Sequence, residues 1–95
     1  MSEGNKTRYK RANLDNYQLT EKLASLIPLE TIQKYQFLPL EILGEEGDQT
    51  LKIAMSNPLD FACREYLRIT TGLKILPLRA GKKKIQVAIR NIQAA

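Results

Sequence analysis

Few side chains in this sequence are of a type that can carry out chemistry. The 95 residues include no histidine and a single cysteine, Cys63. This composition excludes a disulfide within the chain, metal sites built from histidine and cysteine, and nucleophiles activated by histidine. Cys63 lies in an apolar pattern with helical spacing, which favours a plain buried thiol. We therefore predict no catalytic residue, no metal and no cofactor, and we do not expect the chain to be an enzyme.

Two further motifs resemble chemical sites but lack essential members. A Gly-Lys pair at 81–82 resembles the end of a phosphate-binding loop, which also needs an earlier glycine and a serine or threonine after the lysine. This sequence has Leu76 and Lys83 at those positions. The acidic residues of segment 44–49 lie in a glycine-containing turn, where no burial separates their pKa values for acid–base catalysis. We assign neither a nucleotide site nor an acid–base pair.

Three consecutive lysines, Lys82, Lys83 and Lys84, are the residues to which we assign a binding role. They lie at the start of a predicted helix, where the positive end of the helix dipole disfavours each exposed cation by about 0.3–1 kcal/mol. Three interpretations remain open: the lysines are a solvated charge run at a frayed first turn, the helix begins after them, or the cluster contacts an acidic partner. Together with Arg79, the three lysines form the predicted partner-docking surface.

The net charge of +5 is distributed unevenly along the chain. Residues 1–14 hold four basic side chains and one acidic side chain, a net +3, which leaves +2 for residues 15–95. The first segment has no hydrophobic periodicity and is predicted to be a basic, disordered tail. A nucleic-acid-binding fold usually carries its charge on a folded face between aromatic residues. The pattern therefore argues against nucleic acid. A merely solvating tail, an acidic partner and an anionic membrane surface remain open.

Length and hydropathy predict one small domain over residues 15–95. The apolar fraction is 43% and the charged fraction is 26%, which are typical of a globular protein. No apolar run approaches the roughly 18 residues of a membrane span. The charged N-terminus is not followed by the apolar segment of a secretory signal. We expect a cytoplasmic protein without a membrane span.

Hydrophobic periodicity predicts seven elements. Helices are indicated by apolar residues at three- and four-residue spacing, and strands by alternation. In the first helix, Asp15 and Gln18 resemble a capping box. Pro28 ends this helix and starts the next one. The predicted elements are helices over 15–27 and 28–34, strands over 37–43 and 50–55, a helix over 58–71, a strand over 73–80 and a helix over 83–92.

Prolines constrain the sheet that these strands form. Pro39 and Pro77 cannot donate a ladder hydrogen bond, so their strands are predicted to be edges or to carry a bulge. The proline-free strand 50–55 is then central. Its short turn to 37–43 predicts an antiparallel hairpin, and the strand-helix-strand unit predicts a parallel third strand. The expected fold is α+β, a small three-stranded mixed sheet covered by helices on one face, in the order α-α-β-β-α-β-α.

The corner between the central strand and the third helix is predicted to be structural. Asn57 is expected to be the N-cap, Pro58 the first helical residue, and Asp60 a carboxylate near the positive helix end. Gly72 is expected to end the helix. Glycines that would let a phosphate approach are absent and Asp60 repels anions, so an anion site is disfavoured. The predicted buried stripe of this helix comprises Leu59, Cys63, Tyr66 and Thr70, flanked by Ala62 and Leu67.

Segments 26–42 and 51–89 resemble the N-terminal domain of the ATPases that power type II secretion and type IV pilus assembly in bacteria. The resemblance implies a non-catalytic docking and regulatory module. Its implied partners are the cytoplasmic part of an inner-membrane platform protein and, in a full-length member, the ATPase's own motor domain. Through such a partner it would be peripheral at the inner membrane. The residues that carry the resemblance are Leu26-Ile27-Pro28, Tyr35, Leu38-Pro39-Leu40, 51–60, Thr71-Gly72, Ile85, Ala88 and Ile89.

Two alternative functions remain beside docking. Some members of that family bind cyclic di-GMP and carry an upstream repeat that opens with Arg-Leu-Gly; residues 1–25 lack this motif. A cyclic di-GMP receptor of the same fold is therefore an alternative rather than the prediction. The second alternative is a nucleic-acid-binding protein that uses the basic tail.

Overall fold

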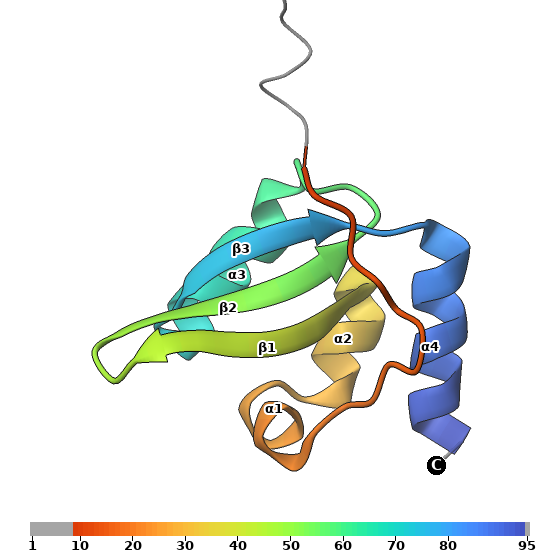
Figure 1. The fold of residues 1–95 in the computed structure, drawn as a ribbon, viewed down its shortest axis with the longest axis horizontal. Coiled ribbons are helices and arrows are strands. Elements are labelled where there is room, and N and C mark those ends of the chain that lie inside the picture. Colours follow the sequence, from red (N-terminus) through yellow and green to blue (C-terminus); the bar gives the residue numbers. More distant parts are fainter. Residues whose placement is uncertain (1–8, 95) are drawn as a thin grey trace, which may run out of the picture.

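The seven elements occur in the predicted order in the computed structural model of this protein, which describes residues 9–94 (Figure 1). The predicted α+β class and three-stranded mixed sheet are confirmed. The elements are α1 (Glu21–Leu26), α2 (Leu29–Tyr35), β1 (Phe37–Glu45), β2 (Asp48–Met55), α3 (Phe61–Thr71), β3 (Lys74–Arg79) and α4 (Lys82–Ala94).

The sheet has the order β1-β2-β3, so β2 is central as predicted. Strand β1 is antiparallel to β2, and β3 is parallel to β2 after the crossover through α3. Pro39 and Pro77 lie in the two outer strands. A proline has no N–H to donate, and in an outer strand this does not interrupt the hydrogen bonding at the centre of the sheet. The register of β1 shifts between Pro39 and Glu41, so Leu40 is the extra residue of a bulge.

The hairpin turn is shorter than the predicted loop 44–49. Strand β1 extends through Glu45 and β2 begins at Asp48, so only two residues form the turn. Gly47 has φ 92°, which a tight two-residue turn between antiparallel strands favours. Gly44, with φ 96°, lies opposite Gln49, and a Cβ there would be 2.5 Å from the Asp48 carbonyl oxygen. Pairing of the backbone extends both strands despite their acidic ends.

Helix α1 begins later than predicted. Its N-cap is Thr20, whose hydroxyl oxygen accepts a hydrogen bond from a first-turn N–H at 3.3 Å, and Glu21 is the first helical residue. Asp15 and Gln18 lie before the helix, so the predicted capping box is wrong. The reason is local: Asn16 has φ 60°, and a left-handed residue interrupts a right-handed helix.

Residues 10–12 lie along the outer edge of β3. The Arg79 N–H donates to the Lys10 carbonyl oxygen at 2.7 Å, and the Ala12 N–H donates to the Arg79 carbonyl oxygen at 2.8 Å. The predicted disordered tail 1–14 therefore does not hold for these residues, because the free backbone groups of an edge strand supply pairing partners. Residues 1–8 of that prediction lie outside the described residues.

The core lies between the sheet and the helices. In Figure 1, α2 and α3 lie behind the sheet. The N-terminal segment, by which we mean residues 9–19, runs past the ends of β2 and β3 and alongside α4. On α3 only Cys63 and Leu67 are buried, so the predicted stripe is too wide: Leu59 and Tyr66 are 51% and 41% exposed. The helix packs mainly against β3 at one edge of the sheet, and an edge strand covers only a narrow part of its surface. The core residues are Leu23, Ile27, Ile32, Phe37, Leu38, Leu51, Ile53, Ala54, Met55, Cys63, Leu67, Ala80, Ile85, Ala88 and Ile89.

Candidate functional site: a basic surface

The corner between β2 and α3 is closed by its own side chains. Asp60, rather than Asn57, is the N-cap of α3, and its Oδ1 accepts a hydrogen bond from the Cys63 N–H at 3.3 Å. Asn57 Oδ1 accepts from the Leu59 N–H at 3.2 Å and thereby holds the turn before the helix. Pro58 therefore lies within this turn and is not the first helical residue. The predicted start of the helix was three residues too early. Both Asn57 and Asp60 are good N-cap residues, and the turn between them makes Asp60 the N-cap.

The same corner offers little to an anion. Its backbone donors at Leu59, Asp60 and Cys63 are already hydrogen-bonded within the turn, and the cap is itself a carboxylate. At the other end of α3, Gly72 has φ 73°, the left-handed conformation that ends a helix with little strain in glycine. These residues shape the chain and leave binding to other surfaces.

The thiol of Cys63 is buried and inert. Burial, together with the neighbouring Asp60 carboxylate, raises its pKa to about 12. A thiolate is the reactive form of cysteine, so this side chain is not a nucleophile near neutral pH. Within residues 9–94, no three His, Cys, Asp or Glu side chains come together in a way that could hold a metal ion.

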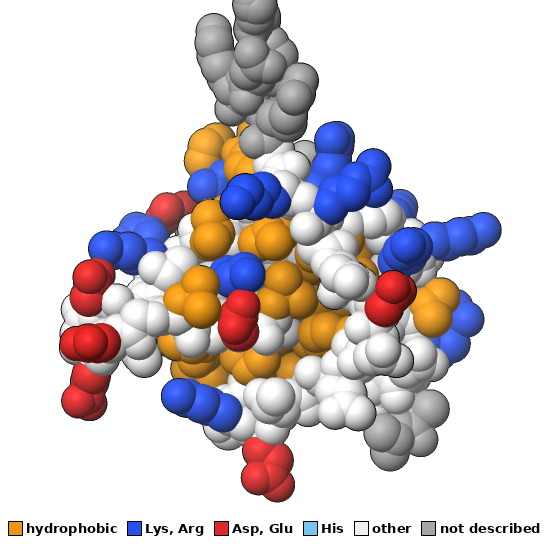
Figure 2. Space-filling view, in the orientation of Figure 1, with side chains coloured by type: hydrophobic (Ala, Val, Ile, Leu, Met, Phe, Trp, Pro, Cys, Tyr) orange, Lys and Arg blue, Asp and Glu red, His pale blue; other side chains and the backbone are white. Residues whose placement is uncertain are grey.

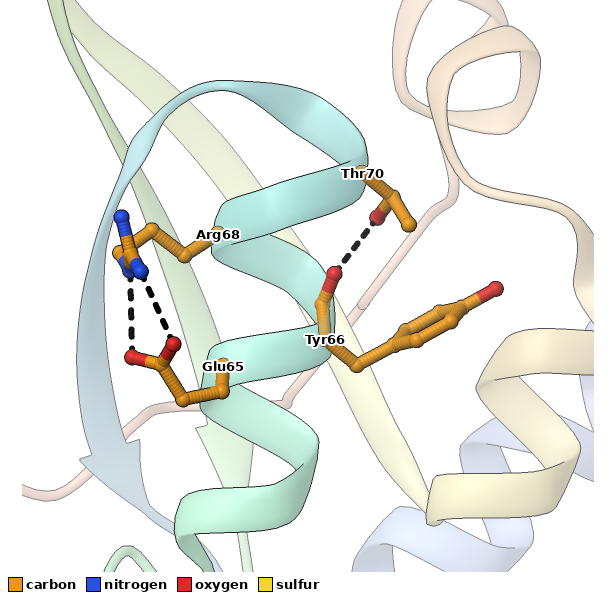
Figure 3. Close-up of polar contacts among 4 residues, drawn as sticks. All are labelled: Glu65, Tyr66, Arg68 and Thr70. Atoms are coloured by element: carbon orange, nitrogen blue, oxygen red, sulfur yellow. Dashed lines mark hydrogen bonds and ion pairs between the residues drawn. The ribbon is translucent and has the colours of Figure 1, made fainter.

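The exposed face of α3 carries polar groups that satisfy one another (Figure 3). Arg68 donates two hydrogen bonds to the Glu65 carboxylate, at 2.9 and 3.1 Å, and the hydrogen bond from Arg68 lowers the pKa of Glu65. The Thr70 hydroxyl donates to the Tyr66 carbonyl oxygen at 2.9 Å. The Tyr66 ring lies 5.3 Å from the Tyr35 ring of α2. These groups do not converge on a common point, so α3 presents no polar site.

Six basic side chains come together where β3 ends and α4 begins. The pairing of residues 10–12 with β3 brings two of them beside Arg79, and two residues connect Arg79 to the lysines of α4. All six are exposed. In Figure 2, lysine and arginine side chains gather over this region, and acidic side chains gather at the opposite end, over the β1–β2 turn. We call this set the basic surface; its members are Lys10, Arg11, Arg79, Lys82, Lys83 and Lys84.

The lysines lie in the first turn of α4. Helix α4 begins at Lys82, and the Gly81 carbonyl oxygen accepts a hydrogen bond from the Ile85 N–H at 3.0 Å. The interpretation that the helix begins after the lysines is therefore wrong. The helix forms despite the unfavourable dipole because its other face is anchored by Ile85 and, one turn later, by the buried Ala88 and Ile89.

No ion pair between described residues neutralises the basic surface. The ion pairs among residues 9–94 join Lys52 to Glu41, Arg68 to Glu65 and Lys74 to Asp48, and none includes a member of the basic surface. Helix α4 has four basic residues and no acidic one. The amide dipoles at its start add to the same positive potential. The chemistry of this surface is attraction of carboxylates or other anions.

Sequence analysis identified four of the six members. Lys10 and Arg11 were assigned to the tail, because nothing in their own sequence signals that they pair with β3. The available signal is indirect: an edge strand leaves free N–H and C=O groups that a neighbouring segment can use.

None of the helices within residues 9–94 has both the length and the apolar composition that a membrane crossing requires.

Comparison with known proteins finds a family model and solved structures that resemble this chain. The family model described as the MshEN domain matches residues 7–95. A solved structure of MshE with cdg has a TM-score of 0.65 and 22% identity, over 88% of this chain and 58% of that chain. The XpsE N-terminal domain has a TM-score of 0.56 and 18% identity, over 95% of this chain and 54% of that chain. The chain thus spans somewhat more than half the length of each solved chain. No curated protein matches it significantly.

Proposed function

This chain belongs to the MshEN domain family, the N-terminal domains of type II secretion and type IV pilus ATPases, and we propose that it docks such an ATPase to its membrane platform. The domain is non-catalytic and separate from the catalytic ATPase. Its partner is the cytoplasmic part of an inner-membrane platform protein, which holds the domain in the cytoplasm at the membrane face. Docking of this kind also makes the domain a regulatory element, because it couples the partner to the motor.

The observation that carries this proposal is the uncompensated charge at the start of α4. Lys82, Lys83 and Lys84 each lie where the helix dipole disfavours a cation, by about 0.3–1 kcal/mol when exposed. Three such residues reduce the free energy of unfolding by about 1–3 kcal/mol, a large part of the margin of a small domain. A carboxylate-rich partner would reverse this effect, because the same charges then contribute attraction. Binding accounts for residues that folding alone disfavours.

The test is a pull-down of the cytoplasmic part of the platform protein. Replacing Lys82, Lys83 and Lys84 by serine should weaken capture without lowering the melting temperature. The matched control replaces three exposed cations outside the basic surface, Lys22, Lys34 and Arg90, by serine and should capture as the wild type does. Absence of capture by the wild-type chain, or equal loss in both triple variants, would contradict the proposal.

A second candidate function is favoured by one comparison. MshE, to which this fold is similar, has a solved structure with cdg (cyclic di-GMP), so a receptor role is the alternative for this chain. Isothermal titration calorimetry with cyclic di-GMP separates the two functions. Saturable micromolar binding that persists in the Lys82, Lys83 and Lys84 serine variant would support a receptor, and no heat of binding would leave docking as the function.

A further inference from the structure

A groove lies between the N-terminal segment and α4. One wall is formed by residues 14–17 and the other by the exposed flank of α4 from Lys83 to Asn91, with a volume of about 480 Å³. A hollow of about 380 Å³ continues it toward Arg11 and Gly81, and one of about 440 Å³ continues it toward Leu19. From residue 83 to residue 92 a helix rises about 14 Å, which is the length of about four residues of extended chain. The groove therefore suits an extended peptide.

The two ends of the groove differ in chemistry. The end near the start of α4 is lined by Arg11, Lys83 and Lys84, with Asp15 as the carboxylate among its lining residues, so the lining carries a net +2. The middle is apolar: Leu14 and Ala88 line it. Val87, also there, is 48% exposed. A ligand must therefore offer negative charge at one end and an apolar side chain about one helical turn away.

From this arrangement we propose that the groove binds an extended acidic segment of a partner protein. Its carboxylates contact Lys83, Lys84 and Arg11, and an apolar side chain of the same segment packs on Val87. The inference rests on the proposed docking function and deepens it, because it names the face of the domain and the chemistry of the partner segment. The contacts come from side chains along α4, and the free amides at its N-terminus are not required.

Other anionic partners fit this groove less well. A membrane surface is flat and reaches the rim of a concave groove but not the apolar middle. Single-stranded nucleic acid gains much of its affinity from stacking on aromatic rings. Tyr17 is the aromatic side chain among the groove's lining residues, and its hydroxyl is held by the Pro39 carbonyl oxygen at 2.7 Å. A second copy of this chain could offer the acidic turn at 45–48, which lies at the opposite end of the molecule (Figures 1 and 2).

The direct experiment titrates the isotope-labelled protein with the peptide acetyl-Glu-Glu-Leu-Glu-Glu-Leu-amide and follows backbone amide signals by nuclear magnetic resonance. We expect saturable shifts at Lys83, Val87 and Asn91, and no saturable shift with the peptide in which glutamine replaces every glutamate. Equal binding of the glutamine peptide, shifts confined to α3, or no saturable shift at all would overturn the inference.

Matched variants separate the charged and apolar contacts. The double variant Lys83→Glu/Lys84→Glu should bind the peptide at least tenfold more weakly. Its loss cannot be attributed to unfolding, because carboxylates are favoured in the first turn of a helix. Val87→Ser should bind about threefold to tenfold more weakly, since burial of a few methyl groups is lost. Arg90→Glu changes the same charge on the same helix outside the groove and should stay within twofold of the wild type; equal loss in Arg90→Glu would overturn the inference.

The same variants distinguish this inference from the proposed function. If Val87→Ser captures the platform protein as well as the wild-type chain does, while Lys83→Glu/Lys84→Glu does not, the groove assignment fails and docking through the basic surface stands. If the wild-type chain does not capture it, the docking function fails whatever the peptide does. Self-association measured by analytical ultracentrifugation and abolished by Glu45→Lys/Glu46→Lys would replace the partner segment by a second copy.

Discussion

Lys82→Glu should make this domain more stable. Lys82 is the first residue of α4, and the first turn of this helix contains no acidic side chain. Removing a cation from the positive end of the dipole gains about 0.3–1 kcal/mol, and adding an anion there gains a similar amount. We take about 1.2 kcal/mol as the expected increase in the free energy of unfolding. For a domain of this size it corresponds to a rise of about 5–10 °C in the melting temperature.

The assay is thermal and urea unfolding followed by circular dichroism at low ionic strength, with Lys82→Gln and Arg90→Glu as companions. Lys82→Gln should give about half the effect, because it removes the cation without adding an anion. Arg90→Glu makes the same change of net charge away from the helix start and should not stabilise. The advantage of Lys82→Glu should shrink near 1 M salt, where the Debye length falls to about 3 Å.

A fall in stability for Lys82→Glu, or an equal rise for Arg90→Glu, would refute this reasoning. The first result would mean that Lys82 makes a stabilising contact within the fold. The second would mean that the gain comes from lower net charge and not from the helix dipole. In either case the argument that folding disfavours the lysines, and that binding explains them, would lose its physical basis.

Three further predictions test the fold around the site. Asp60→Ala should lower the free energy of unfolding by about 1 kcal/mol in urea titrations, because the N-cap of α3 is lost, whereas Asp60→Asn should nearly preserve it; equal losses would contradict the cap. Burial raises the pKa of Tyr17, so the stability that depends on its protonated hydroxyl is full below the ordinary pKa near 10 and is lost as the pH rises above that value. Tyr17→Phe should therefore reduce the loss of stability measured between about pH 9 and 11. An unchanged alkaline profile would contradict this. Gly44→Ala should cost about 1–3 kcal/mol in the same titrations, because a Cβ meets the backbone carbonyl across the hairpin, and Gly81→Ala, where the Cβ meets open space, should cost less than about 1 kcal/mol.

The sheet could be predicted because its constraints are local. Alternation of apolar residues marks the strands, and Pro39 and Pro77 exclude their strands from the centre. The turn residue Gly72 is likewise specified by a backbone conformation that glycine adopts with little strain. Such features depend on a few neighbouring residues, so a single sequence contains enough information to place them.

The sequence-based predictions were wrong where two neighbouring residues could play the same role, or where the contact that determines the structure is distant in the chain. Both Asn57 and Asp60 can cap a helix, and the turn geometry decides between them. The helix predicted from Asp15 fails because of one left-handed residue, Asn16, which periodicity does not register. The pairing of residues 10–12 with β3 depends on an edge 67 or more positions away in the chain, a contact that the composition of the segment does not signal.

The basic surface shows both situations within one site. The lysines of α4 were identified from their position in a predicted helix, because a dipole argument needs only local sequence. Lys10 and Arg11 join them through a long-range strand contact and so were missed. The groove was missed for the same reason, since one of its walls is the segment assigned to a tail.

The most direct test of the account is the salt dependence of binding to the cytoplasmic part of the platform protein. Calorimetric dissociation constants should be measured at about 0.1 M and about 1 M salt, between which the Debye length falls from about 10 Å to about 3 Å. We predict at least tenfold weaker binding of the wild-type chain at high salt, and little salt dependence for the variant with serine at Lys82, Lys83 and Lys84. Wild-type binding that is equally tight at both salt concentrations, or a serine variant that binds as tightly as the wild type, would contradict a docking function based on this charge.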